Sequence, residues 1–227
     1  MNIIITRPEN DSKSLAKRLE AMGHYVFMMP LISIVVRPAV SLPKKNYQAI
    51  CFTSANGVRS LGSIAGLENY PVIAVGPQSL DAALKAGFRN VSAQGGDVEG
   101  IVYYITRNCD PHLGPLLYIS GSETSGDLEG KLTLAGFMVD RVITYDALPS
   151  NLSNDENKIG QSDAVMLYSP RSAKIWQAEI MRLDLQNAAE KITHYCLSAN
   201  IATALPKSWP KIVAKFPTEA SILAALE

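Results

Sequence analysis

The sequence lacks the features that mark several large classes of protein. Its 227 residues carry 21 basic and 21 acidic side chains, so the formal net charge is zero, which argues against nucleic acid as the main partner. No stretch approaches the roughly 18 consecutive apolar residues that read as a membrane span. The first residues, MNIIITRPEND, have no basic segment of the kind that opens a signal peptide. We therefore expect a cytoplasmic protein, a monomer, with neither a nucleic-acid nor a membrane partner.

The sequence also lacks metal-ligand and disulfide patterns. Its cysteines are odd in number and without motif spacing, as in a reduced cytosolic protein: they are Cys51, Cys109 and Cys196. The three histidines are scattered, and none stands near a cysteine or an acid at metal-ligand spacing. We expect no metal site.

Nucleotide-binding and nucleophile motifs are missing as well. Residues 95–100, GGDVEG, do not form GxGxxG, and no strand is expected directly before them, which argues against a dinucleotide site. There is no Walker A pattern and no GxSxG elbow, and residues 120–122, SGS, have no evident histidine partner. Any catalysis would therefore proceed without a metal, a nucleophilic triad or a paired carboxylate.

What the sequence does contain is a repeated alternation of short apolar runs with segments of helical periodicity. Apolar residues make up 47% of the chain and charged residues 19%, enough for a substantial core. The polar stretch 151–162 is expected to be a loop or linker. Strand, helix, strand in succession predicts an α/β fold with mostly parallel sheets flanked by helices. The runs expected as strands are residues 2–6, 25–29, 49–52, 71–75, 116–119, 164–168, 194–197 and 212–215.

Parts of the chain recur at offsets of about 113 to 122 residues, which indicates two similar domains. The segments 15–26 and 128–139 share two leucines, a glycine and a valine at matching positions. Similarity among βα units in general is the alternative explanation, but the matches follow one another in the same order. The matching pairs are Leu15 and Leu128, Leu19 and Leu132, Gly23 and Gly136, Val26 and Val139, residues 52–58 and 167–173, residues 74–79 and 196–201, and Glu99 and Glu219.

The order of the matches predicts an interleaved chain path. Residues 1–35 together with 150–227 would form one domain, and residues 40–142 the other. Two crossover strands, at about 30–38 and 139–149, would join them as a hinge. Tyr145 lies on the second of these strands, so we expect it at the mouth of a cleft between the domains.

Small polar residues follow most of the expected strands, where helices begin. Free backbone N–H groups and the positive end of the helix dipole favour carboxylate or phosphate at such places, and ligands of open α/β sheets bind beyond the carboxyl ends of the strands. The alternative is that these residues only cap helices. Arg7, directly after the first strand, is a further candidate for an anionic ligand. The candidate binding residues are Thr53, Ser54, Asn56, Gly76, Ser79, Gly121, Ser122, Ser169, Ser172, Ser198 and Thr218.

Taken in order, several motifs resemble those of the uroporphyrinogen-III synthase family. They are IIITRP, PLISI, FTSANGV, AVGP, LLYISG, ITY, VMLYSPRSA and FPTEASILAAL, and they extend over nearly the whole chain. The resemblance implies two α/β domains joined by a two-stranded crossover. It also implies a cofactor-independent lyase that closes the linear tetrapyrrole hydroxymethylbilane into uroporphyrinogen III, inverting ring D and losing water.

The resemblance assigns a role to Tyr145, which matches the tyrosine that the family carries on its crossover strand. A phenol there would donate a hydrogen bond or a proton to the leaving hydroxyl group. The alternative is that Tyr145 is an aromatic packing residue on its strand. Tyr168 is a second tyrosine, expected to support the end of its strand. The sequence departs from the family at residues 198–201, SANI in place of Gly-Pro-Thr-Thr, and at residues 97–99, DVE in place of Thr-Ser-Glu. A two-lobed binding protein for an anionic small molecule, or a catalytically impaired family member, is the alternative.

Overall fold

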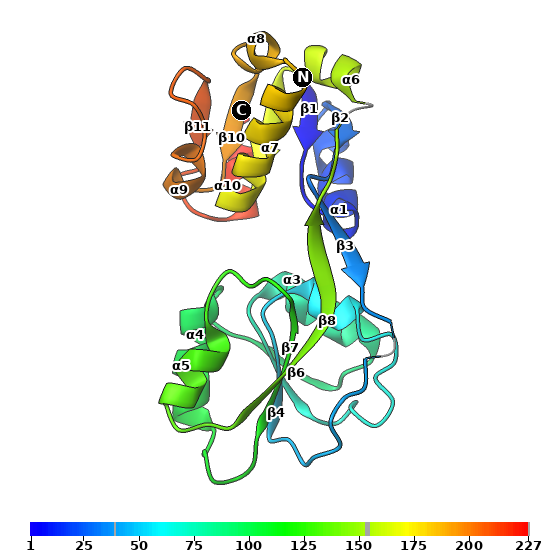
Figure 1. Cartoon of the computed structure of the whole chain (residues 1–227), viewed down its shortest axis with the longest axis vertical. Coiled ribbons are helices and arrows are strands. Elements are labelled where there is room, and N and C mark those ends of the chain that lie inside the picture. Colours follow the sequence, from blue (N-terminus) through cyan, green and yellow to red (C-terminus); the bar gives the residue numbers. More distant parts are fainter. Residues whose placement is uncertain (39, 153–154, 227) are drawn as a thin grey trace. The chain divides into compact units, whose positions relative to one another are not determined.

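The computed structural model describes residues 1–38, 40–152 and 155–226, and it divides into two compact α/β units (Figure 1). Unit 1 consists of Met1–Ser33 with Leu148–Glu227, and unit 2 consists of Ile34–Ala147. The chain therefore passes from one unit to the other twice. The prediction of two α/β domains with parallel sheets is confirmed.

Unit 1 is a five-stranded parallel sheet with helices on both faces, in the spatial order β11-β10-β9-β1-β2. One face packs against α1 and α10, and the other against α6 to α9. Its elements are β1 (Asn2–Ile5), α1 (Glu9–Ala21), β2 (Tyr25–Met28), α6 (Glu156–Gly160), β9 (Ala164–Leu167), α7 (Pro170–Arg182), α8 (Gln186–Ala189), β10 (Thr193–Cys196), α9 (Ala199–Ala202), β11 (Lys211–Val213) and α10 (Glu219–Ala224).

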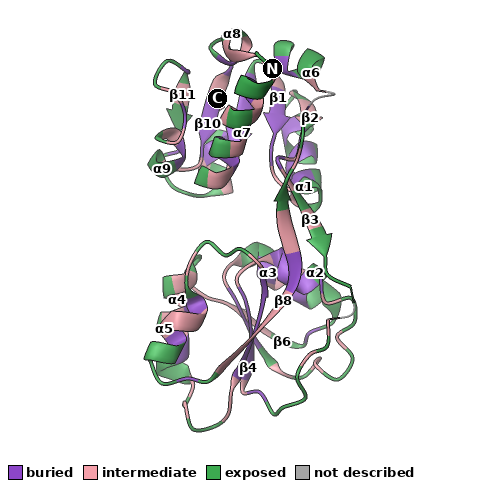
Figure 2. Ribbon diagram, in the orientation of Figure 1, coloured by how far each residue is buried: buried purple, intermediate pink, exposed green. Residues whose placement is uncertain are grey.

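Unit 2 is built in the same way on the sheet β3-β8-β7-β4-β5-β6, whose central strand β4 is buried at every position (Figure 2). Helices α4 and α5 cover one face, and α2 and α3 the other. Its elements are β3 (Ile32–Val36), β4 (Ala49–Phe52), α2 (Ala55–Arg59), β5 (Pro71–Ala74), α3 (Pro77–Ala86), β6 (Asn90–Ala93), α4 (Val98–Asn108), β7 (Leu116–Gly121), α5 (Leu128–Leu134) and β8 (Val139–Pro149), of which β3 and β8 extend into unit 1.

The two sheets share one strand order, which gives the internal repeat a structural meaning. Read from β2, unit 1 runs β2-β1-β9-β10-β11, and unit 2 runs β8-β7-β4-β5-β6 from the matching position. Leu15 of α1 and Leu128 of α5 belong to the equivalent helix of each unit, and both are fully buried. Gly23 and Gly136 follow that helix with φ of +84° and +89°, values that favour glycine. The repeated residues therefore mark equivalent packing positions.

Strand β3 pairs with β8 and is the one member of either sheet without a counterpart in the other. The Arg37 amide donates to the Thr144 carbonyl at 2.8 Å, and the Ser150 amide donates to the Leu31 carbonyl at 3.0 Å. Residue numbers rise on one strand as they fall on the other, so this pairing is antiparallel. Both chain passages between the units thus belong to one two-stranded ladder.

Two local predictions were wrong. The polar stretch 151–162 contains the short helix α6, which buries Ile159 against the unit 1 core. Strand β6 stands directly before residues 95–100, where no strand was expected. It was missed because Val91 is its only large apolar residue, as suits the edge of a sheet.

His194 is a buried structural residue of unit 1. Its Nε2 accepts a hydrogen bond from Trp176 Nε1 at 3.0 Å, its Nδ1 lies 3.0 Å from the Pro210 carbonyl, and its ring stacks on Trp209. Both contacts are met by a neutral ring with its proton on Nδ1. Burial lowers the pKa of His194 from 6.5 to about 4.

This shift makes unit 1 sensitive to acid. Between pH 6.5 and pH 4 the unfolded chain takes up a proton on His194 that the folded chain excludes, so stability falls as the pH falls. At about 1.4 kcal/mol per pH unit, we expect the free energy of unfolding to drop by about 3 kcal/mol over this range. Urea denaturation followed by tryptophan fluorescence measures it. In His194→Gln the slope between pH 6.5 and pH 5 should flatten, and an unchanged slope would assign the effect elsewhere.

Candidate active site

In unit 2 the candidate residues gather at the carboxyl edge of the sheet. Thr53 and Ser54 follow β4, Gly76 follows β5, Gly121 is the last residue of β7, and Ser122 follows it. These three strands are neighbours in the order β7-β4-β5 and run parallel. The sequence therefore predicted correctly that these residues lie at one edge of one sheet.

The pairing of β7 with β8 shifts register at this edge. Ser120 is opposite Ile143, but the next residue, Gly121, is opposite Tyr145, so Thr144 is an extra residue on β8. Thr144 is buried; its hydroxyl lies 2.5 Å from the Ser60 hydroxyl and 3.4 Å from the Ser120 carbonyl. A bulge of this kind redirects the side chain that follows it.

The redirected side chain is that of Tyr145, which is only 6% exposed. Its ring lies over the backbone of Gly121: a Cβ placed on that glycine would be 2.8 Å from the ring carbons Cε2 and Cζ and 3.1 Å from the hydroxyl. Glycine is required here by close approach. Whether Tyr145 faces a cleft remains a prediction.

Arg141, which the sequence analysis missed, fixes the end of β7. Its guanidinium donates to the Ser120 hydroxyl at 2.9 Å, the Gly121 carbonyl at 3.0 Å and the Ser122 carbonyl at 3.2 Å. The Ser122 amide in turn donates to the Tyr145 carbonyl at 3.0 Å. These bonds hold Gly121 and Tyr145 against each other.

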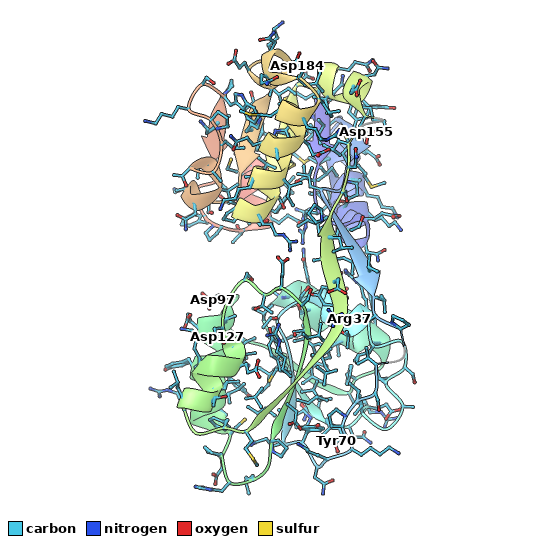
Figure 3. All side chains as sticks on the ribbon, in the orientation of Figure 1. Arg37, Tyr70, Asp97, Asp127, Asp155 and Asp184 are labelled. Carbon is cyan, nitrogen blue, oxygen red and sulfur yellow. The ribbon has the colours of Figure 1, made fainter. Side chains whose placement is uncertain are left out.

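An ion pair on the crossover strands adjoins Tyr145. Arg37, labelled in Figure 3, donates from Nε and Nη2 to the two carboxylate oxygens of Asp146, at 2.9 and 2.8 Å. The hydrogen bond from Arg37, and then one from Ser122, lower the pKa of Asp146 to about 2. Asp146 is therefore ionised throughout the neutral range, and it is unsuited to act as an acid there.

The remaining unit 2 candidates are engaged in local contacts. The Thr53 hydroxyl lies 2.9 Å from the Tyr118 hydroxyl. Asn56 is buried and accepts from Arg59 at 3.0 Å. Ser79 is buried within the first turns of α3. The hydrogen bond between Thr53 and Tyr118 joins the neighbouring strands β4 and β7. Residue spacing in the sequence does not predict it, because the two residues are 65 positions apart.

In unit 1 the candidates also lie at the carboxyl edge of the sheet. Arg7 follows β1, Ser169 follows β9, Ser198 precedes α9, and Thr218 precedes α10. Ser172 is buried in the first turn of α7, with its hydroxyl 2.8 Å from that of Ser169. Each unit thus presents a row of polar groups at the equivalent edge of its own sheet.

The capping explanation holds for several of these side chains. Hydroxyls of Ser54, Ser169 and Thr218 accept from amides of the helices that they precede. Gly76 and Ser198 begin helices without a side-chain cap bond. Such caps leave the hydroxyl free to donate as well, so capping and ligand binding are compatible.

Gly121 and Ser122 were expected where a helix starts, and this was wrong. A loop intervenes, and α5 begins only at Leu128, capped by Asp127, whose carboxylate accepts from the Gly130 amide at 2.8 Å. Asp97 caps α4 in the same way, and both aspartates are labelled in Figure 3. The glycine and serine pattern after β7 reflects the contact with Tyr145 instead.

A hollow of about 780 Å³ lies in unit 2 away from these residues. It is lined by the segments that lead into β4 and β5, including Tyr47 and Tyr70, so it is at the amino edge of the parallel sheet. The Tyr47 hydroxyl donates to Asp140 at 2.9 Å, and Lys45 pairs with the same carboxylate at 2.7 Å. These two side chains thus already have a charged partner, and the hollow does not include the candidate site.

Within the described part of the chain, no group of three or more histidine, cysteine or acidic side chains is placed to hold a metal ion. Among the same residues no helix is long and apolar enough to span a membrane.

Comparison with known proteins decides the family. The sequence profile described as uroporphyrinogen-III synthase HemD matches residues 13–224. The chain belongs to the uroporphyrinogen-III synthase family. It is therefore an enzyme of this type, a cyclising lyase of tetrapyrrole biosynthesis, and its substrate is a small-molecule tetrapyrrole.

Solved structures of uroporphyrinogen-III synthases share the fold. The enzyme from Helicobacter pylori is 16% identical, with a TM-score of 0.64 over 99% of this chain and 97% of that one. A mutant enzyme from the extremely thermophilic bacterium Thermus thermophilus is also 16% identical, with a TM-score of 0.53 over 100% of this chain and 97% of that one. No curated protein sequence gives a match.

The contact between Gly121 and Tyr145 can be tested by adding one methyl group. Gly121→Ala places its Cβ 2.8 Å from the Tyr145 ring, and we expect a loss of about 1–3 kcal/mol in the free energy of unfolding. Gly160→Ala is the matched control, because nothing lies within 4 Å of a Cβ at that glycine. In a Tyr145→Ala background the cost of Gly121→Ala should shrink. Equal costs in both backgrounds would refute the contact.

Proposed function

We propose that Tyr145 is the group through which this chain converts hydroxymethylbilane to uroporphyrinogen III. The observation that carries the proposal is the register shift that turns Tyr145 over Gly121 at the carboxyl edge of the sheet. A phenol can donate a proton and hold it at neutral pH. The neighbouring Asp146 is unsuited to this role, since its contact with Arg37 keeps the carboxylate ionised.

The reaction depends mainly on how the enzyme positions the two ends of its linear substrate. Donation from the phenol to the leaving hydroxyl of the substrate releases water and leaves an azafulvene cation. Attack by the substituted carbon of ring D on this cation gives a spiro intermediate. The bond from that carbon to the methylene group of ring C then breaks, and the free α-carbon of ring D bonds to the same methylene group, which leaves ring D inverted. That α-carbon loses a proton, which returns to the phenolate and restores Tyr145. Because closure without a catalyst gives the uninverted isomer, the enzyme must hold the chain ends in the reactive arrangement.

We propose that the strand-end residues hold the carboxylates of the substrate. Backbone N–H groups and hydroxyls supply donors without a large excess of arginine and lysine, which agrees with a formal net charge of zero. The binding residues are Arg7, Thr53, Ser54, Asn56, Gly76, Ser79, Gly121, Ser122, Ser169, Ser172, Ser198 and Thr218. Backbone contacts are compatible with the departures from the family pattern at residues 97–99 and 198–201.

The remaining proposals concern setting and assembly. We propose a cytoplasmic monomer that acts without cofactor, metal, nucleic acid or membrane. The cysteines support a reducing compartment, since Cys51, Cys109 and Cys196 are unpaired. The two domains would be residues 1–35 with 150–227 and residues 40–142.

Tyr145→Phe tests the proposed donor. Loss of a general acid reduces turnover by about 10²–10⁴-fold, and we expect a fall of this size in the formation of uroporphyrinogen III from fresh hydroxymethylbilane. Chromatography of the oxidised products resolves isomers I and III. Tyr103→Phe is the control, because Tyr103 is an exposed tyrosine of α4.

The two variants should differ clearly. With Tyr103→Phe, isomer III should form at the wild-type rate. If Tyr145→Phe also forms isomer III at that rate, Tyr145 takes no part in the chemistry. The ring contact with Gly121 would then be its whole role.

A further inference from the structure

The Tyr168 hydroxyl of unit 1 is buried without a hydrogen-bond partner. It is the only buried side-chain nitrogen or oxygen atom without a hydrogen-bond partner in residues 1–38, 40–152 and 155–226. Folded proteins rarely leave such a group unmatched, and each case calls for an explanation. A phenol donates one hydrogen bond and accepts others, so an incoming group with an oxygen acceptor would satisfy it.

Arg7 covers the ring of Tyr168. The guanidinium carbon lies 4.9 Å from the ring centroid, and the two residues follow the adjacent parallel strands β1 and β9. Burial raises the pKa of Tyr168, while the positive charge of Arg7 opposes this shift. The phenol therefore keeps its proton at neutral pH, as a neutral donor beside a guanidinium.

A carboxylate already lies beside this guanidinium. Glu219, the first residue of α10, accepts from Arg7 at 3.2 Å and from Arg18 at 2.5 Å. The side chains of Arg7 and Glu219 are 15% and 24% exposed, so the pair is partly shielded from water. Glu219 satisfies the two arginines, yet the Tyr168 hydroxyl remains without a partner.

Unit 2 contains the equivalent of part of this arrangement. Glu99 on α4 pairs with Lys131 on α5 at 3.0 Å, at the positions that the repeat matches with Glu219 and Arg18. An acidic residue on one helix bound to a basic residue on the next is therefore common to both units. This part of the arrangement needs no ligand to explain it.

The other part is specific to unit 1. The repeat matches Tyr168 with Thr53, whose hydroxyl is satisfied by Tyr118 at 2.9 Å. It matches Arg7 with Ser120, which is not basic. Unit 2 also places a guanidinium over a phenol, with Arg141 5.8 Å from the Tyr118 ring centroid, but that phenol is matched by Thr53. The unmatched hydroxyl beside a guanidinium is therefore what distinguishes unit 1 from its repeat.

We infer that Arg7 and the Tyr168 hydroxyl bind one carboxylate of the substrate, in competition with the Glu219 carboxylate. The inference rests on the proposed function, because it takes the substrate to be a polycarboxylate. An incoming carboxylate accepts from Arg7 as Glu219 does, and also from the phenol, which Glu219 leaves unmatched. A hydrogen bond to a charged group changes an affinity by about tenfold or more. Movement of the Arg7 and Glu219 side chains is needed to admit it.

Uroporphyrin I is a suitable probe, since it is a stable porphyrin that carries the acetate and propionate side chains of the tetrapyrroles. Fluorescence titration of the full chain with this probe gives the dissociation constant. We expect Tyr168→Phe to weaken binding by about tenfold. The same substitution should leave the thermal midpoint unchanged or higher, because it removes a buried hydroxyl that has no partner.

Two carboxylates lie beside Arg7, that of Glu219 at 3.2 Å and that of Asp11 at 3.9 Å. Glu219→Gln removes the charge of the nearer one. We expect it to tighten uroporphyrin binding by about threefold or more at low salt, and high salt should reduce this gain. Glu99→Gln is the matched control, because it breaks the equivalent pair with Lys131 and should leave the affinity unchanged. In a Tyr168→Phe background the gain from Glu219→Gln should shrink, which shows that both act on one carboxylate.

The outcomes separate this inference from the proposed function. Unchanged affinity in Tyr168→Phe, or equal effects of Glu219→Gln and Glu99→Gln, overturns the carboxylate site even if the wild type makes uroporphyrinogen III. Altered affinity in the expected directions supports the site. If the wild type nevertheless fails to turn over hydroxymethylbilane, it is the proposed reaction that falls.

Discussion

The register shift between β7 and β8 is the constraint on which the candidate site depends. One extra residue, Thr144, is accommodated because its hydroxyl is matched inside unit 2 by Ser60. The shift brings Tyr145 opposite Gly121, the one residue type whose missing Cβ admits the ring. Arg141 then ties the end of β7 in place. A buried hydroxyl pair, a glycine and a guanidinium together fix one phenol.

The same strand carries a second consequence. After passing Tyr145, β8 continues to Pro149 and pairs antiparallel with β3, while its first half is a parallel member of the unit 2 sheet. Strand β8 therefore forms backbone hydrogen bonds with two different strands, β7 and β3, and its side chains have different roles along its length. Arg141 donates hydrogen bonds to the end of β7 within the unit 2 sheet, and Asp146 forms an ion pair with Arg37. Tyr145 lies between these two residues in the sequence.

Much of the fold could be predicted because its signals are local. Leu15 with Leu19 and Leu128 with Leu132 have helical spacing and are all fully buried. Gly23 and Gly136 stop their helices with positive φ, as their positions in the repeat indicated. The order of these pairs along the chain was enough to predict two α/β units. Helical spacing and a glycine at the end of a helix depend only on residues close together in the sequence.

The site was less predictable because its contacts join residues far apart in the sequence. Arg141 reaches Ser122 and Glu219 reaches Arg7 only after the sheets have formed. The bulge at Thr144 leaves no pattern in the sequence. Gly121 and Ser122 at the end of β7 resemble a helix start in the sequence, although the glycine is explained by a ring on the adjacent strand. Pairing across strands, unlike periodicity, has no signature in a single sequence.

The central claim is that this chain directs ring closure with inversion of ring D. The most direct measurement is to add the purified wild-type chain to fresh hydroxymethylbilane and determine the isomers of the completed product. We expect isomer III to predominate, and its share to rise with the amount of protein until closure without catalyst is outcompeted. Product consisting of isomer I at every protein concentration would contradict it.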